Sequence, residues 1–120
     1  MEQDDLTFTI NGAIYEVNRV LGSGFMEKVY ENALMQELKR RGLHAENQVP
    51  IKVYYKGAVV GDYLADIVVE RQVIIELKAT EFLSKYQVAQ LINYLKATNH
   101  RVGLLVNFTE PKAEIRRIVC

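Results

Sequence analysis

The sequence predicts a single α/β domain over residues 1–120, in which helices flank a mixed β-sheet in the order ααβββαβ. The first observation is a change of hydrophobic period, from helical before Gly42 to alternating after it, and back to helical between Ser84 and Thr98. The second is composition, because 120 residues, 49% hydrophobic and 25% charged, suffice for one packed core. Helical and strand segments that alternate in this way favour an α/β architecture.

The N-terminal third is predicted to be a helical hairpin. Apolar side chains recur every three or four positions in residues 6–21, and polar residues fill the opposite face. Gly22-Ser23-Gly24 interrupts this pattern, and Ser23 is a suitable N-cap for a second helix that runs toward Gly42. The apolar positions of the two helices are Leu6, Ile10, Ile14, Val17 and Leu21, then Phe25, Val29, Ala33 or Leu34, and Leu38.

Three antiparallel strands in a meander are expected next. Apolar and polar residues alternate over residues 49–55, and Lys56-Gly57 is typical of a tight turn. Residues 59–69 and 73–79 are rich in β-branched side chains, and the polar residues 70–72 separate them.

The last third returns to a helix and then to strands. Residues 84–98 have a helical hydrophobic period, and residues 102–108 are a nearly continuous apolar run that is typical of a buried strand. Residues 115–119 are a candidate for one further short strand.

Charge and cysteine content narrow the classes of function. Fifteen basic and fifteen acidic residues cancel, so nucleic-acid binding would need a local basic patch. The single cysteine, Cys120, cannot form an intrachain disulfide. No apolar run reaches the roughly 18 residues of a membrane span, and the acidic residues 2–5 do not fit the basic start of a signal peptide. We therefore expect a cytoplasmic protein with no membrane partner.

Asp66, Glu76 and Lys78 are the residues best suited to chemistry. Because alternate residues of a strand share a face, Glu76 and Lys78 point the same way. If residues 70–72 form a three-residue hairpin loop, Asp66 lies directly opposite Glu76, with Cβ atoms about 4.5 to 5.5 Å apart. Such a pair of like charges destabilises a sheet unless a cation neutralises it, and two carboxylates with a backbone carbonyl and waters suit Mg²⁺. Lys78 is then placed to orient a water molecule or to stabilise charge on a phosphate.

A solvated surface pair is the alternative interpretation of Glu76 and Lys78, because exposed ion pairs often have no function. Burial argues against it. Both Asp66 and Glu76 interrupt strand faces that are otherwise apolar, and an unpaired buried carboxylate is costly.

Two helices contribute further polar candidates. Glu27 precedes Tyr30 and Leu34 by one and two turns, so its carboxylate lies on or beside the packing stripe, although an ordinary first-turn acid that interacts with the helix dipole is the alternative. Gln90 and Tyr94 are four residues apart on one helical face, where they could bind a phosphate, hold the lysine or serve only the structure.

Several of these motifs occur in the order of a known family. Gly24-Phe25-Met26-Glu27-Lys28-Val29-Tyr30 reads G-x-x-E-x-x-Y, and Glu31-Asn32-Ala33-Leu34, Gln48-Val49-Pro50, Tyr63-Leu64-Ala65-Asp66, Glu76-Leu77-Lys78 and the segment from Ala89 to Lys96 follow it. Over residues 6–119 the sequence resembles the GxxExxY protein family, a small branch of the PD-(D/E)XK nuclease superfamily.

The resemblance implies a restriction-endonuclease-like core with Asp66 and Glu76 as metal ligands and Lys78 as the catalytic lysine. Glu27 matches the acid that many members carry on the first core helix. Gln90 and Tyr94 resemble the Q-x-x-x-Y motif of the RecB-like branch, and Tyr30 joins them as an expected auxiliary or nucleic-acid-binding residue. The chain departs from the pattern in two places, with Ala65 where the superfamily's name has proline and Leu64 where relatives often carry arginine.

The sequence thus predicts a Mg²⁺- or Mn²⁺-dependent nuclease acting on nucleic acid, most simply DNA. Asp66, Glu76 and the backbone carbonyl of Leu77 are expected to bind the metal, Lys78 to position the hydroxide, and Glu27 to complete the site directly or through water.

The alternative is a non-catalytic nucleic-acid-binding or protein-interaction module, which zero net charge favours. A homodimer would enlarge the footprint of either. Candidate phosphate contacts, each equally explained as solvated surface, are Lys39, Arg40 and Arg41, Lys85 and Lys96, and Lys112, Arg116 and Arg117.

Overall fold

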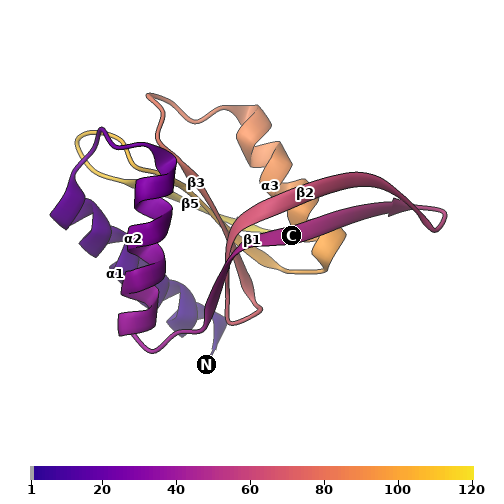
Figure 1. Cartoon of the computed structure of the whole chain (residues 1–120), viewed down its shortest axis with the longest axis horizontal. Helices are drawn as coiled ribbons and strands as arrows, with labels where there is room; N and C mark the ends of the chain where they lie inside the picture. The colour runs from indigo at the N-terminus through magenta and orange to yellow at the C-terminus, as the bar shows by residue number, and fades with distance from the viewer. Residues whose placement is uncertain (1) are drawn as a thin grey trace.

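The computed structural model describes residues 2–120, which form a five-stranded mixed sheet with helices on both faces (Figure 1). The strands lie in sequence order, antiparallel except for β3 and β4, which are parallel. They are β1 (Ala45–Tyr55), β2 (Ala58–Val69), β3 (Val73–Lys78), β4 (Val102–Asn107) and β5 (Glu114–Val119). The predicted α/β class, mixed sheet and ααβββαβ order are confirmed, and β5 is the further short strand, at one edge.

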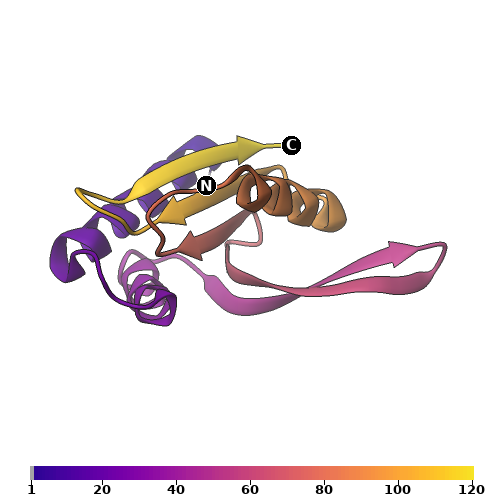
Figure 2. The same cartoon turned by 90° about the horizontal axis from the view of Figure 1, so that it is seen from above.

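The helices α1 (Gln3–Leu21) and α2 (Glu27–Arg40) cover one face of the sheet, and α3 (Lys85–Thr98) covers the other (Figure 2). A helix is needed between β3 and β4 because parallel neighbours cannot be joined by a tight turn. Gly103 of β4 lets α3 approach closely, since a Cβ there would lie 2.9 Å from Leu91 Cδ1. None of the described helices combines the length and the apolar character that a membrane span requires.

The loop before α2 differs from the sequence prediction. Ser23 is not the N-cap; Met26 occupies that position without a side-chain cap, and α2 begins at Glu27. Gly22 and Gly24 both have positive φ, 68° and 107°, so the chain turns through a glycine-specific conformation before it enters the helix. The Ser23 hydroxyl instead donates to Glu110 Oε1 at 3.0 Å, which ties this loop to the segment after β4.

The β1–β2 hairpin reaches well beyond the rest of the sheet (Figures 1 and 2). β3 pairs with β2 only at Ile67, Val68 and Val69, so the far half of the hairpin is a two-stranded ribbon. Its turn has positive φ at Lys56 and Gly57, the mirror-image geometry that matches strand twist. α3 therefore lies against one side of a ribbon that is otherwise open to solvent.

Candidate active site

Asp66 and Glu76 lie where β2 and β3 separate. The two strands pair in the register Val69 with Val73, Val68 with Ile74 and Ile67 with Ile75, so Asp66 and Glu76 are the next pair along. This is the register that a three-residue hairpin loop predicts. Regular backbone pairing between β2 and β3 stops before this pair.

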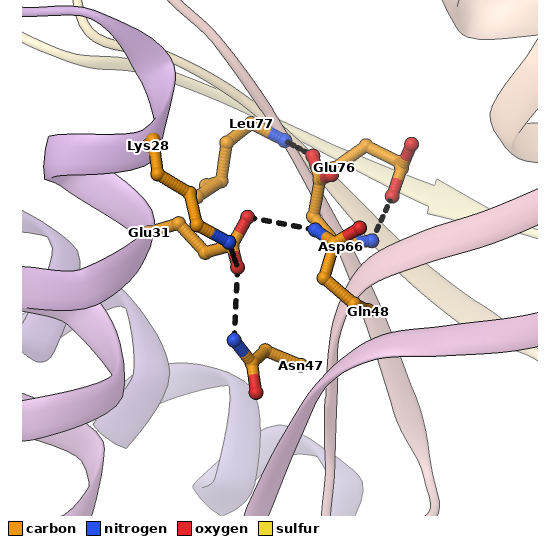
Figure 3. A network of polar contacts seen from close by, with 7 residues as sticks. All are labelled: Lys28, Glu31, Asn47, Gln48, Asp66, Glu76 and Leu77. Carbon is orange, nitrogen blue, oxygen red and sulfur yellow. Dashed lines mark hydrogen bonds and ion pairs between the residues drawn. The ribbon is translucent and has the colours of Figure 1, made fainter.

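Each carboxylate replaces a backbone bond of the ladder. The amide of Asp66 donates to Glu76 Oε2 at 2.7 Å, and the amide of Leu77 donates to Asp66 Oδ2 at 2.7 Å (Figure 3). The side chain of each strand is thus anchored to the backbone of the other, which fixes both acids at the start of the gap between the strands. Hydrogen bonds of this charge-assisted kind are strong enough to orient a carboxylate.

The second oxygen of each carboxylate remains available. Asp66 Oδ1 and Glu76 Oε1 make no hydrogen bond with any described residue, and neither is among the fully buried atoms without a partner, so both reach solvent. The pair therefore presents two oxygens to a ligand.

Burial makes the charged state of this pair costly. Glu76 is 5% exposed, and burial together with the negative charge of Asp66 raises the pKa of Glu76 to about 8. Burial also raises the pKa of Asp66, which the amide of Leu77 opposes and the charge of Glu31 reinforces. A cation bound between the two acids would relieve this penalty.

Lys78 follows Glu76 by two residues on β3 and is half-buried. Its positive charge lowers the pKa of both Asp66 and Glu76, although less than burial raises them. Among the described residues it takes part in no ion pair, unlike Lys28 and Lys52. Its ammonium group is therefore near the acids and unengaged.

Glu27 is the exposed first residue of α2, and its charge raises the pKa of both acids. Within residues 2–120, however, no three His, Cys, Asp or Glu side chains are grouped closely enough to hold an ion. The structure brings Glu27 toward the acid pair but does not gather it as a third direct ligand.

Glu31, one turn further along α2, is a residue that the sequence argument missed. It is 4% exposed, and its carboxylate accepts three hydrogen bonds of 2.9 Å, from Lys28 Nζ, Asn47 Nδ2 and Gln48 Nε2 (Figure 3). A signal was present, because Glu31 lies three residues before Leu34 on the buried stripe of the helix.

Of the two roles expected for Tyr30, contact with nucleic acid and an auxiliary role, its position excludes the first. It is fully buried, its ring stacks on Phe108 with centroids 4.2 Å apart, and its hydroxyl donates to Gly22 O at 2.6 Å and accepts from the amide of Phe25 at 3.2 Å. A tyrosine so enclosed cannot touch nucleic acid. Tyr30 instead holds the glycine loop against the core.

Gln90 and Tyr94 lie on α3 and line a groove of about 620 Å³ between that helix and the β1–β2 hairpin. Asp66 and Glu76 do not line it. Tyr94, however, packs in one buried cluster with Ala65, the residue before Asp66, and Tyr63 of the groove stands on β2 three residues before Asp66. Burial, and next the negative charge of Glu76, raise the pKa of Tyr94 to about 12. The groove is therefore close to the acid pair but does not include it.

The basic side chains that are candidate phosphate contacts differ in whether they already have a partner within the protein. Arg41 pairs with Glu37 at 2.9 Å, Arg116 with Glu114 at 2.8 Å, and Arg117 with Asp4 at 3.5 Å. Lys85 and Lys112 lie over the rings of Tyr86 and Tyr15. Lys96 lines the groove.

Comparison with known proteins relates the chain to one family by its sequence and to two solved structures by its fold. The sequence profile of the PD-(D/E)XK nuclease superfamily matches residues 4–118. No curated protein matches the chain significantly.

Two solved structures are similar. The crystal structure of SSO0001 superposes with a TM-score of 0.60 at 22% identity, covering 77% of this chain and 48% of that one, so this chain spans about half its length. An alkaline exonuclease from Laribacter hongkongensis has a TM-score of 0.49 at 12% identity, covering 91% of this chain and 68% of its own.

Proposed function

The chain belongs to the PD-(D/E)XK nuclease superfamily, and we propose that it is a Mg²⁺- or Mn²⁺-dependent nuclease that hydrolyses phosphodiester bonds of DNA. The observation that carries the proposal is the crossed pair of hydrogen bonds that presents Asp66 and Glu76 side by side, with Lys78 two residues further along β3 on the face of Glu76. A structural ion pair needs one acid and one base, whereas this arrangement places two acids together at a cost.

The donor set fits a hard divalent cation. Asp66 Oδ1, Glu76 Oε1 and the carbonyl of Leu77 would hold it, since Mg²⁺ in nucleic-acid enzymes is bound by one or two carboxylates and completes its shell with waters and phosphate oxygens. When bound, such an ion polarises the phosphate and lowers the pKa of a water ligand. The exposed carboxylate of Glu27, whose charge raises the pKa of both acids, would act through a water molecule.

Lys78 supplies a positive charge beside the acids. In hydrolysis the oxygen of water forms a new bond to phosphorus, the bond to the leaving oxygen breaks, and negative charge grows on the phosphate oxygens. An ammonium group fixed on a strand stabilises that charge without reorganising. Gln90 and Tyr94 line the groove near the acids, where they would contact a bound strand of nucleic acid.

Two finer assignments belong to the same proposal. The segment from Gly24 to Tyr30, which reads G-x-x-E-x-x-Y, supports assignment to the GxxExxY branch of the superfamily, and the small footprint of one copy supports a homodimer. The molar mass in solution, measured by light scattering, tests the dimer independently of activity.

The decisive experiment is a cleavage assay. Labelled single- and double-stranded DNA and RNA are incubated with the protein in Mg²⁺, in Mn²⁺ and in a chelator. We expect cleavage only in the samples that contain Mg²⁺ or Mn²⁺. The cleavage rate of Asp66→Asn should be lower by about 100-fold or more, because several kcal/mol of charge stabilisation disappear. Asp5→Asn is the matched control, since Asp5 is an exposed carboxylate on α1.

If the wild-type protein binds nucleic acid but cleaves none of these substrates, the nuclease proposal is contradicted and the non-catalytic binding module is supported. Equal activity in Asp66→Asn and Asp5→Asn would remove the acid pair from the mechanism.

A further inference from the structure

The groove beside the acid pair has aromatic walls that come from two elements. Tyr63 of β2 and Tyr86 of α3 are 45% and 75% exposed, and Tyr94 of α3, 5% exposed, lies between them and the core. The rings of Tyr63 and Tyr94 are 5.5 Å apart between centroids. Exposed tyrosine rings gathered around one hollow are unusual on a surface that only meets water.

The remaining lining is mixed and almost uncharged, with Val53, Ala89 and Ala97 as its apolar members. Gln90 and Asn93 contribute amide groups, and Lys96 is the one charged residue among those that line the groove. Affinity for a duplex depends chiefly on neutralising phosphates with lysine and arginine, and here only Lys96 in the lining and Lys85 over the ring of Tyr86 offer such contacts. Four of the arginines elsewhere are already paired with acids of the chain.

Tyrosine faces and amide groups match the chemistry of an unpaired base. A base in a duplex hides its faces in the stack, whereas a base in a single strand stacks on aromatic side chains and exposes edges to amides. Tyr63 of the groove stands three residues before Asp66 on β2, and Tyr94 packs in one buried cluster with Ala65, the residue before Asp66. A strand whose bases occupy the groove would therefore have its backbone close to the carboxylates.

We propose that the groove between α3 and the β1–β2 hairpin binds an unpaired stretch of nucleic acid, whose bases stack on Tyr63 and Tyr86 and whose backbone leads to Asp66 and Glu76. The protein then acts on single strands and frayed ends in preference to continuous duplex. This inference rests on the proposed function for the identity of the ligand, and it goes beyond it in naming the form of the substrate and the residues that select it.

Binding is measured by fluorescence anisotropy with labelled oligonucleotides, one single-stranded and one fully paired, with Ca²⁺ in place of Mg²⁺ to suppress turnover. We expect the single strand to bind more tightly. Tyr86→Ala and Tyr63→Ala should each weaken its binding by about 5- to 150-fold, the loss of one base–aromatic stack, while Tyr86→Phe retains it. Tyr54→Ala is the matched control, because Tyr54 is a 63% exposed tyrosine of the same hairpin that does not line the groove.

Salt dependence is the second measurement. Because Lys96 is the one charged residue that lines the groove, Lys96→Gln should reduce by about 0.7 the slope with which the logarithm of affinity for a single strand falls with the logarithm of salt. Circular dichroism of each variant confirms that the fold is kept.

The outcomes separate this inference from the nuclease proposal. If the protein cleaves duplex as fast as single strand, and if Tyr86→Ala has the activity of the wild type, the nuclease proposal stands and the proposed role of the groove is wrong. If the protein binds single strands through Tyr86 but cleaves no substrate, the proposed role of the groove is supported and the nuclease proposal is contradicted. Equal binding of duplex and single strand, or no binding of either, overturns the inference.

Discussion

Glu31 Oε1 accepts a 2.9 Å hydrogen bond from Gln48 Nε2, which joins α2 to β1 beside the acid pair (Figure 3). Gln48 stands in β1 between the pairs Asn47–Ile67 and Val49–Ala65, next to Asp66, and has a positive φ of 52°. A side chain other than glycine costs roughly 1–2 kcal/mol in this conformation. The bond to Glu31 offsets that cost and holds β1 in place next to Asp66.

Glu31→Ala should lower the free energy of unfolding by about 1–3 kcal/mol, because Asn47 and Gln48 lose a buried acceptor. Urea denaturation in a chelator measures it. Glu37→Ala on the same helix is the control, since Glu37 forms one pair with Arg41 at a partly exposed site, worth about 0.5 kcal/mol. Equal losses in the two variants would show that the contacts of Glu31 have no special weight.

Stability should depend on pH through Glu76. Its pKa is about 8 in the folded protein and near 4.5 when unfolded, so between these values the folded state binds more protons. The resulting stabilisation is complete below about pH 4.5 and is lost as the pH rises through 8. Asp66 acts in the same direction, because its pKa is also raised.

We therefore expect metal-free protein to lose on the order of a few kcal/mol between pH 5 and pH 8.5 from this group. Urea denaturation across that range gives the profile. Glu76→Gln should flatten it, and an unchanged profile in that variant would assign the dependence to other groups.

Millimolar Mg²⁺ or Mn²⁺ should raise the melting temperature, since an ion that binds only the folded state stabilises it by mass action. Asp66→Asn should abolish this shift and, by removing a like charge beside Glu76, should raise the stability of the metal-free protein. Differential scanning calorimetry measures both. If the melting temperatures of the wild type and of Asp66→Asn rise equally with metal, the ions do not bind at Asp66.

Lys78→Ala distinguishes an enzyme from a binding module. If the ammonium group acts mainly in the transition state, the variant loses most cleavage while its affinity in Ca²⁺ stays nearly unchanged. In a binding module Lys78 is at most one phosphate contact, so its loss weakens affinity modestly and reduces the salt slope by about one unit. Cleavage rates and anisotropy on one oligonucleotide give both quantities.

Tyr30→Phe tests the structural assignment of this tyrosine. It removes the hydroxyl that bonds Gly22 and Phe25, and should cost about 0.5–1.5 kcal/mol in stability while the stacking on Phe108 remains. Affinity for nucleic acid should not change at a temperature where the variant is folded. A selective loss of affinity in a fully stable variant would contradict the structural assignment of Tyr30.

Several features are predictable from the sequence because their causes are local. The polar residues 70–72 are just long enough for a three-residue loop, and the loop length sets the register that brings Asp66 opposite Glu76. Ser84 and Gln87 form a reciprocal capping box, so the start of α3 depends on neighbours three residues apart. The start of α2 lacks such a cap, and Ser23 bonds instead to Glu110, 87 residues away.

The sequence by itself determined the order of elements, the mixed sheet and the Asp66, Glu76 and Lys78 strand positions, because hydrophobic period and turn length act within a few residues. Only the tertiary structure decided that Glu31 is buried among donors 16 and 17 residues away and that Tyr30 is enclosed by Phe108. It also decided that Tyr63 and Tyr86 form opposite walls of one groove. The physical reason is that burial and contact depend on which distant element covers a side chain, and periodicity along the chain carries no record of that element.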